Sequence, residues 1–438
     1  MKNKTLPIIL CLAAILRLAL LVSAWNRPEG FSTPDSEDYK TLAQSLVQHL
    51  DFQHDSQPEI FRTPGYPLFL SMGFLLGWKF VIVVQVLLDV LVVYLTYRLG
   101  TLLCRRRVGL WAAAFQAVSL VAMVSSVRLL SDGLFTLLAL LAIVLLAFYF
   151  RSGRFWALPC AAVTAGVACY VRPIGLLFGL VAILVLVFRR RQRLRGTATF
   201  AALFVACVLP WIVRNACRAG YPAFSSVGAV NLYAYEAPAT LAGAEGISLV
   251  RAQEQLAAEL TKAPPGEQAR RMQAVALGVI LEHPWTWVKV HTITSLASFL
   301  PAVTDVLEVL GVTTGGRGTL GVLHEQGPSA AMRHYFGGAT WAVGLCLPAV
   351  ILLAVQYLLV AAAAIKYLRP GTDAAAWLIL LTILVTCLAG GPASTPRFRV
   401  PAAPLLSLAA AAGLVALASL LKKAGMQGIQ GIKKPKTT

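Results

Sequence analysis

The segment from Ser32 to Leu46 places acidic side chains directly after a proline. Pro34 predicts a turn, and apolar residues recur after it at helical spacing, so we expect a helix that begins near Asp35. The Asp35 carboxylate could cap the N-terminus of that helix, or it could serve as a general base that accepts a proton from a substrate. Glu37 and Asp38 are expected to face other directions on the helix.

A second candidate is the segment Phe61–Phe69, in which residues 64–67 contain two prolines and a glycine. Such a run predicts a rigid turn, which would hold Arg62 and Tyr66 at one membrane face. The two side chains could anchor the chain in the interface. Alternatively, Arg62 could bind an anion while Tyr66 forms an aromatic wall beside it.

Two acids lie in or beside apolar runs, where a carboxylate is costly. Asp132 lies where one run ends and the next begins, so it is either a functional acid or the partner of Arg128, four residues earlier. Asp89 lies in the middle of a run, and we expect it to form a structural ion pair inside a helix bundle.

Further arginines lie at the ends of apolar runs, on the same expected side of the membrane as Asp35. Arginines are unexpected on that side, although each alone could extend to the interface. Taken with Arg62, they predict a phosphate site, because the planar guanidinium binds phosphate through two parallel hydrogen bonds. These four residues are Arg172, Arg214, Arg397 and Arg399.

The elements that must position these residues are apolar runs of membrane-spanning length. The chain has 438 residues, of which 58% are apolar and 13% charged, and its mean hydropathy is +0.72. One span needs about 20 apolar residues. We therefore expect an all-α polytopic membrane protein with about ten transmembrane helices and further helices at its outer face. The expected spans are 6–25, 80–103, 108–127, 133–150, 155–171, 174–188, 196–214, 339–365, 374–391 and 400–421.

The net charge of +19 is distributed as short basic clusters between these runs. That pattern is typical of cytoplasmic loops, so both chain ends are expected inside, and nucleic-acid binding is not indicated. An eleventh crossing at 284–303 would place the lysine-rich tail outside and is disfavoured. The clusters are Arg105–Arg107, Arg151 with Arg154, Arg189–Arg195, Lys366 with Arg369, and Lys422–Lys436.

We expect a single transmembrane domain, 1–421, followed by a basic cytoplasmic tail, 422–438. Two long segments would lie outside the membrane, the first at 26–79 and the second at 215–338. The second is expected to hold an interfacial helix at 285–300, because tryptophans mark its start. The eight cysteines show no Cys-x-x-Cys spacing, so neither a zinc site nor a disulfide framework is indicated.

In combination, these motifs resemble GT-C glycosyltransferases of the bacterial family-39 type, which include protein O-mannosyltransferases and the aminoarabinose transferase of lipid A. The first outer segment is similar to the family's acidic motif followed by a tyrosine, here Asp35 and Tyr39, and to its Arg-x-Pro-Gly-Tyr-Pro motif at Arg62. Asp132 resembles the family's acid at the start of the fourth span. The likeness runs from Arg17 to about Leu421 and includes Pro210–Asn215, Gly220–Pro222, Asn231–Tyr233, His283–Trp285 and Arg397–Pro401.

The resemblance implies a GT-C fold and a reaction in which a sugar moves, with inversion, from a polyprenyl-phosphate donor to a hydroxyl. It implies that Asp35 takes the acceptor proton and that Asp132 orients the acceptor or a donor hydroxyl. The arginines would stabilise the leaving phosphate, and Tyr39 and Tyr66 would contact substrate. The acceptor would be a glycolipid, a glycan or a protein, and the protein would lie in the bacterial inner membrane with its site facing the periplasm.

The sequence departs from the family pattern at two points. Asp35 is followed by Ser36 rather than by a second acid, so no metal ligand is assigned and a divalent metal stays open. The large C-terminal soluble domain of some relatives has no counterpart in the sequence, which weakens the expectation of a protein acceptor.

A polytopic transporter or lipid flippase is the competing interpretation. Such proteins often show internal repeats and glycine or proline breaks in the middle of the membrane. Neither is evident in the sequence, and the candidate polar residues gather at one face. A glycosyltransferase is therefore favoured.

Overall fold

The computed structural model describes residues 4–188, 193–258, 260, 263–312, 319–338, 341–367 and 373–432. Within these ranges the regular structure is helical, apart from one short antiparallel hairpin formed by β1 (Gln53–His54) and β2 (Gln57–Pro58). The predicted all-α class is confirmed. Parts of three predicted basic clusters, at 189–192, 368–372 and 433–438, lie outside the described residues.

Six helices of the described chain are long and apolar enough to cross a membrane by themselves. Each coincides with a predicted span, and large apolar side chains cover their outward faces as well as the core, as a lipid environment requires. The chain is thus a multi-pass membrane protein. The six are α1 (Thr5–Ala24), α5 (Trp78–Leu103), α8 (Asp132–Ser152), α11 (Arg193–Ala219), α20 (Ala342–Tyr367) and α22 (Ala403–Ile432), the last preceded by the 3₁₀ turn η5 (Pro396–Ala402).

The other predicted spans are broken or short. Span 108–127 is two helices, α6 (Arg106–Ala117) and α7 (Leu120–Val127), which meet at a 56° bend. Three more are helices of 14 or 15 residues, about 22 Å long, whereas the hydrocarbon layer is about 30 Å thick. These three are α9 (Ala157–Val171), α10 (Gly175–Phe188) and α21 (Ala374–Leu388).

The bundle interior holds the ion pair predicted for Asp89. Its partner is Arg17 of α1, which is fully buried and also donates to the carbonyl oxygens of Ala13 and Ala117. Protein groups thus accept the hydrogen bonds of this guanidinium, as a charge inside an apolar bundle requires. The predicted structural role of Asp89 is confirmed.

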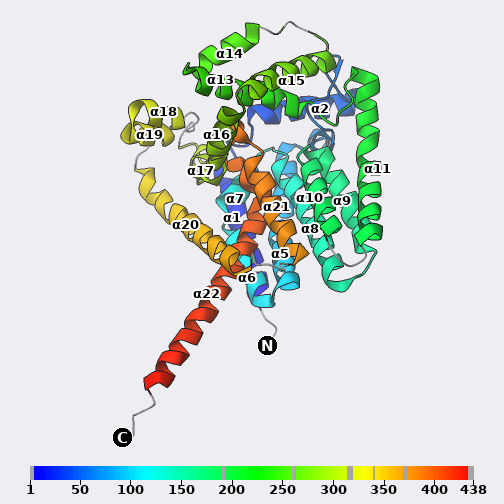
Figure 1. Ribbon diagram of the computed structural model, residues 1–438. Coiled ribbons are helices and arrows are strands. Elements are labelled where there is room, and N and C mark those ends of the chain that lie inside the picture. The colour runs from blue at the N-terminus through cyan, green and yellow to red at the C-terminus, as the bar shows by residue number, and fades with distance from the viewer. Residues whose placement is uncertain are drawn as a thin grey trace.

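Arg151 lies at one end of the bundle, where α5 and α8 end and α21 begins. Arg151, at the end of α8, donates to the carbonyl of Leu103 at 2.8 Å and pairs with Asp373 at 3.1 Å. The last residues of α5 and α8 therefore meet the start of α21. Figure 1 shows α22 extending away from the bundle at this end.

The opposite end, here called the outer end, is covered by short helices (Figure 1). They come from the two long segments predicted to lie outside the spans. The first supplies η1 (Pro28–Gly30), α2 (Pro34–His49), α3 (Gly65–Leu70) and α4 (Met72–Leu76). The second supplies α12 (Val227–Asn231), the π-helical turn η2 (Leu232–Glu236), α13 (Ala237–Glu245), α14 (Leu249–Ala258), α15 (Pro265–Glu282), α16 (Pro284–Ser295), η3 (Leu296–Phe299), α17 (Val303–Val309), α18 (Thr319–Gln326) and α19 (Pro328–Tyr335), and η4 (Gly391–Ala393) joins α21 to η5.

The segment predicted as an interfacial helix at 285–300 is α16 with η3, and α17 follows after a 55° bend. By length and composition this bent pair also qualifies as a broken span. The interfacial placement therefore stays a prediction, which the fusion experiment below addresses.

Candidate functional site

Thr33, not Asp35, caps the N-terminus of α2. The Thr33 hydroxyl accepts from the Ser36 amide at 3.3 Å, and the Ser36 hydroxyl accepts from the Thr33 amide at 2.9 Å. This reciprocal pair is a capping box. Asp35 is the second helical residue, so the alternative that treated its carboxylate as the cap is wrong and the side chain is left for other contacts.

The proline-rich segment after Arg62 begins a helix rather than forming a rigid turn. Pro64 is the N-cap of α3, and Gly65 is its first residue. A Cβ on Gly65 would lie 2.7 Å from the carbonyl of Tyr170, so glycine allows α3 to approach α9 closely. The predicted turn is corrected accordingly, because proline at a helix start loses no intrahelical hydrogen bond.

Five of the predicted site residues meet at the outer end, and we call them the charge cluster: Asp35, Arg62, Asp132, Arg172 and Arg397. Arg397 bridges both acids, with its Nε 2.7 Å from Asp132 and its terminal nitrogen 2.6 Å from Asp35. Arg62 binds the other oxygen of Asp35 at 2.8 Å. Arg172 pairs with the other oxygen of Asp132. Each carboxylate is therefore held between two arginines.

The cluster is assembled from five parts of the chain, one of them the segment before α3 that carries Arg62. Asp35 comes from α2, Asp132 from the first residue of α8, Arg172 from the end of α9 and Arg397 from η5. The side chain of Asp132 is 1% exposed, whereas that of Asp35 is 33% exposed. Of the two acids, Asp35 is the one that a substrate can reach.

Arg128 does not pair with Asp132, so that alternative is wrong. Its terminal nitrogens lie 3.2 Å from Asp305 and 2.6 Å from Glu308, both on α17. The chain leaves α7 at Arg128 in an extended conformation before α8 begins, so the four-residue spacing does not follow a helix. Arg128 instead fastens α17 to the bundle.

Asp38 belongs beside the cluster, contrary to the expectation that it faces elsewhere. Arg62 contacts Asp38 at 2.8 Å with the same nitrogen that binds Asp35. Residues three apart on a helix share a face, which explains the arrangement. Glu37 does point away and pairs with Lys40 at 2.9 Å.

Two tyrosines, Tyr39 and Tyr66, pack beside the cluster. The Tyr39 hydroxyl lies 3.0 Å from that of Ser131, and the Tyr66 hydroxyl donates to Gln85 at 2.7 Å. Their rings pack edge to face at 4.8 Å, and the Arg62 guanidinium lies 4.9 Å from the Tyr39 ring. Tyr66 is fully buried and packs against Tyr39, whereas the sequence suggested an aromatic wall beside Arg62.

Arg214 lies apart from the charge cluster. It donates to the carbonyl oxygens of Glu59 and Phe52 and lies 4.8 Å from the ring of Trp211. It therefore fastens the first outer segment to α11.

Arg399 is also separate from the cluster, although only one residue lies between it and Arg397. One of its nitrogens donates to the carbonyl of Ser298 at 2.9 Å, to that of Leu300 at 3.0 Å and to the Tyr357 hydroxyl at 2.6 Å. These contacts join η5 to η3 and α20. Of the five arginines predicted to bind phosphate, the structure thus brings three together.

The electrostatics of the cluster keep its exposed members charged. Burial alone would raise the pKa of Asp35, but Arg397 and Arg62 outweigh it and hold that pKa well below its usual range. Burial alone would lower the pKa of Arg62, but Tyr39 and Asp35 raise it above its usual value. Counting Asp38, three guanidinium groups face three carboxylates.

The cluster does not fit a divalent metal. Among the described residues there is no group of three or more His, Cys, Asp or Glu side chains with metal-ligand geometry. Asp35 and Asp132 are each bound by two arginines, whose positive charges would repel a cation. No step of the chemistry below is therefore assigned to a metal.

A further polar group, missed in the sequence, holds the loop that leads to Arg397. Glu236 accepts from Trp287 at 3.0 Å and lies 2.8 Å from His291 Nδ1, whose other ring nitrogen lies 2.8 Å from the last carbonyl of α21. Gly391 packs against Glu236 with a positive φ of 47°, where a Cβ would clash. The sequence carried no sign of this group, because Glu236 is the last residue of a π-helical turn. The spacing of apolar residues does not reveal such a turn.

Part of the chain matches a known family model. The family model described as dolichyl-phosphate-mannose-protein mannosyltransferase matches residues 62–213, about a third of the chain. Among curated proteins, none matches.

Solved structures of an archaeal oligosaccharyltransferase are among those that match. The apo enzyme of Archaeoglobus fulgidus aligns with a TM-score of 0.53 at 13% identity, covering 98% of this chain and 52% of that one. The A. fulgidus AglB complex with an inhibitory peptide and a dolichol-phosphate aligns with a TM-score of 0.55 at 13% identity, covering 99% and 52%. The chain thus spans about half the length of these proteins, and the likeness shows a shared fold.

Proposed function

We propose that this chain, which has the GT-C fold expected from its sequence, is a glycosyltransferase that moves a sugar from a polyprenyl-phosphate donor to a hydroxyl acceptor, with inversion. The observation that carries the proposal is the charge cluster, where three arginines and two carboxylates meet at the outer end of an apolar bundle. The family model and the dolichol-phosphate bound to AglB support a lipid-linked donor.

The arginines of the cluster suit the donor phosphate. The guanidinium fork binds phosphate oxygens through parallel hydrogen bonds. The Nε of Arg62 is buried without a hydrogen-bond partner among the described residues, so this side chain has a donor left for a ligand oxygen. The polyprenyl tail would lie along the apolar bundle while its phosphate reaches these arginines.

Asp35 is the proposed base, and donor binding would activate it. With both oxygens held by arginines its basicity is low. A phosphate that draws Arg62 and Arg397 toward itself removes those counter-charges, so the pKa of Asp35 rises toward its ordinary value. Asp35 then takes the acceptor proton while the acceptor oxygen bonds to the sugar C1 and the bond from C1 to the phosphate oxygen breaks. The arginines stabilise the charge on the departing phosphate.

Asp132 would act through the arginines rather than on substrate. Both of its oxygens are occupied, by Arg172 and Arg397, and its side chain is 1% exposed. We therefore assign it a positioning role, which replaces the sequence-based expectation that it orients a substrate hydroxyl.

The lipid bound to the protein tests the proposed function directly. Mass spectrometry of the purified protein is expected to find polyprenyl phosphate or its glycosylated form. If no such lipid is found and none binds when added, the glycosyltransferase proposal is wrong and a transporter becomes the better interpretation.

Changing Arg62 to alanine is expected to weaken polyprenyl-phosphate binding at least about tenfold, because charge-assisted hydrogen bonds contribute about 1.5–3 kcal/mol. Lysine should restore binding only in part, since it keeps the charge but loses the planar fork. Titration of the purified variants with polyprenyl phosphate measures the effect. Arg218→Ala, an exposed arginine that pairs with Asp51, is the control, and an unchanged affinity in Arg62→Ala removes Arg62 from the site.

We further propose that the protein lies in the bacterial inner membrane with its outer end facing the periplasm. Reporter fusions after Arg107, Arg154, Arg195 and Arg369 are then expected to read cytoplasmic, and fusions after Asp55 and Gly266 external, because the basic clusters mark inner loops. A cytoplasmic result at Gly266 would contradict the ten-span topology.

A further inference from the structure

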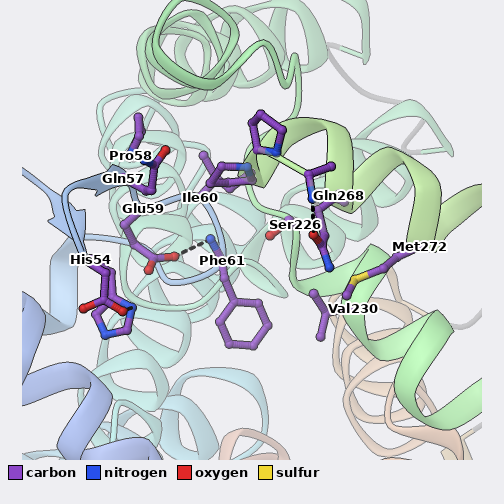
Figure 2. A pocket seen from close by; sticks show the side chains of 15 residues that line it. His54, Gln57, Pro58, Glu59, Ile60, Phe61, Ser226, Val230, Gln268 and Met272 are labelled. Atoms are coloured by element: carbon purple, nitrogen blue, oxygen red, sulfur yellow. Dashed lines mark hydrogen bonds and ion pairs between the residues drawn. The ribbon is translucent and has the colours of Figure 1, made fainter. Parts of the chain in front are cut away.

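A large open cavity lies in the outer layer beside the charge cluster. Its volume is about 880 Å³, within the range of pockets that hold ligands of several rings. Its walls are the segment His54–Phe61, including part of the β1–β2 hairpin, on one side, and α12 with the N-terminal half of α15 on the other (Figure 2).

The cavity wall and Arg62 belong to one fixed segment. The carbonyl of Ile60 accepts from the Ser226 amide at 2.8 Å, and that of Phe61 accepts from the Ser225 hydroxyl at 2.6 Å. The Arg62 guanidinium lies 4.7 Å from the ring of Phe61, which lines the cavity. A ligand in the cavity would therefore lie next to Phe61, whose ring contacts Arg62 of the charge cluster.

The charge of the cavity is opposite to that of the cluster's arginines. Of the fifteen residues that line it, the only ones with a formal charge at neutral pH are Asp55 and Glu59, and none is lysine or arginine. The other polar side chains include Gln57, Gln268 and Ser226. In a protein of net charge +19, this lining would repel phosphates and carboxylates and accept hydrogen bonds from hydroxyl groups.

Resting on the proposed function, we infer that this cavity binds the acceptor and that the bound part of the acceptor is an uncharged glycan. One oxygen of Glu59 already accepts from the amides of Phe61 and Arg62, which leaves its second oxygen and the exposed Asp55 carboxylate as acceptors in the cavity. A sugar chain offers hydroxyl donors to these acceptors, and apolar ring faces to Phe61 and Met272. The phosphate of the donor goes to the arginines, and the acids of the cavity keep anions out. The two substrates would thus be sorted by charge before the sugar is transferred.

The test is transfer of label to native acceptors. Membranes from a deletion strain of the native host are supplied with the full-length protein and with radiolabelled polyprenyl-phosphate-linked hexose or pentose. Met272→Trp fills the cavity from α15, and Gln273→Trp adds the same bulk at the next, exposed position. Met272→Trp should lower transfer at least about tenfold through the acceptor KM while polyprenyl-phosphate binding is unchanged, and Gln273→Trp should behave as the wild type.

The labelled product should pass through an anion exchanger after release of its lipid and should resist protease. Normal transfer by Met272→Trp overturns the cavity as the acceptor site and leaves the glycosyltransferase proposal intact. An anionic lipid headgroup or a peptide as the labelled product overturns the uncharged glycan. If the wild type neither binds polyprenyl phosphate nor transfers label, the proposed function itself fails, and this inference with it.

Discussion

Replacing Asp35 with asparagine is expected to leave a folded protein that binds the donor but transfers sugar roughly a hundredfold to ten-thousandfold more slowly, the usual contribution of a general base. Asparagine keeps the size of the side chain but cannot accept the acceptor proton. The helix should not suffer, because Thr33 and Ser36 form the cap. Turnover at saturating donor, measured beside polyprenyl-phosphate affinity, separates the loss of the base from the loss of binding.

The neighbours of Asp35 provide the controls. Glu37→Gln should be nearly neutral, because Glu37 is exposed and its carboxylate pairs with Lys40, away from the charge cluster. Asp38→Asn is a weaker control than the sequence suggested, since Asp38 shares Arg62 with Asp35. If Asp35→Asn turns over normally while Asp38→Asn is inactive, Asp38 is the base.

The pH dependence tests whether donor binding activates Asp35. In the free protein the two arginines hold the pKa of Asp35 well below its usual range, so the carboxylate stays ionised as the pH falls. If the donor phosphate draws those arginines away, the pKa of Asp35 is higher in the complex. The pH dependence of kcat reports the complex, and that of kcat/KM for the donor reports the free protein. The acidic limb of kcat should then lie at higher pH than that of kcat/KM, and limbs at the same pH would contradict the activation of Asp35 by the donor.

Changing Arg397 to alanine is the second large effect that we expect. This side chain bridges Asp35 and Asp132, and removing a comparable positioned donor to a developing charge costs about a hundredfold to a thousandfold in kcat. Lysine should recover little, because one ammonium cannot reproduce the two-pronged contact. The measurement is the rate of sugar transfer together with polyprenyl-phosphate affinity in protein shown to be folded by thermal unfolding.

Arg399 supplies the matched comparison on the same turn. Arg399 donates to the carbonyls of Ser298 and Leu300 and to the Tyr357 hydroxyl, so Arg399→Ala should lower the unfolding temperature more than it lowers donor affinity. The opposite outcome, in which Arg399→Ala loses donor binding and Arg397→Ala does not, would show that the phosphate site lies at Arg399.

Local sequence rules determined the elements of this protein. Apolar runs of spanning length predicted the six long helices of the described chain, because backbone groups in a bilayer must be satisfied within a helix. The family-like motifs predicted the GT-C fold, and the sequence pointed to all five residues of the charge cluster as candidates for the site. The ion pair of Asp89 also followed from its position alone, since a buried carboxylate needs a partner.

Only the tertiary structure decided which charges meet. Arg128 lies four residues from Asp132, yet it pairs with α17, whereas Arg397 reaches Asp35 across 362 positions of sequence. The rule that residues three or four apart lie side by side holds only within one continuous helix. The chain is extended at Arg128, between α7 and α8, so the rule does not apply to Arg128 and Asp132. The packing of the helices therefore brings Arg172 and Arg397 to the two carboxylates of the cluster. It places Arg214 and Arg399 against backbone carbonyls elsewhere, where they hold segments of the chain together.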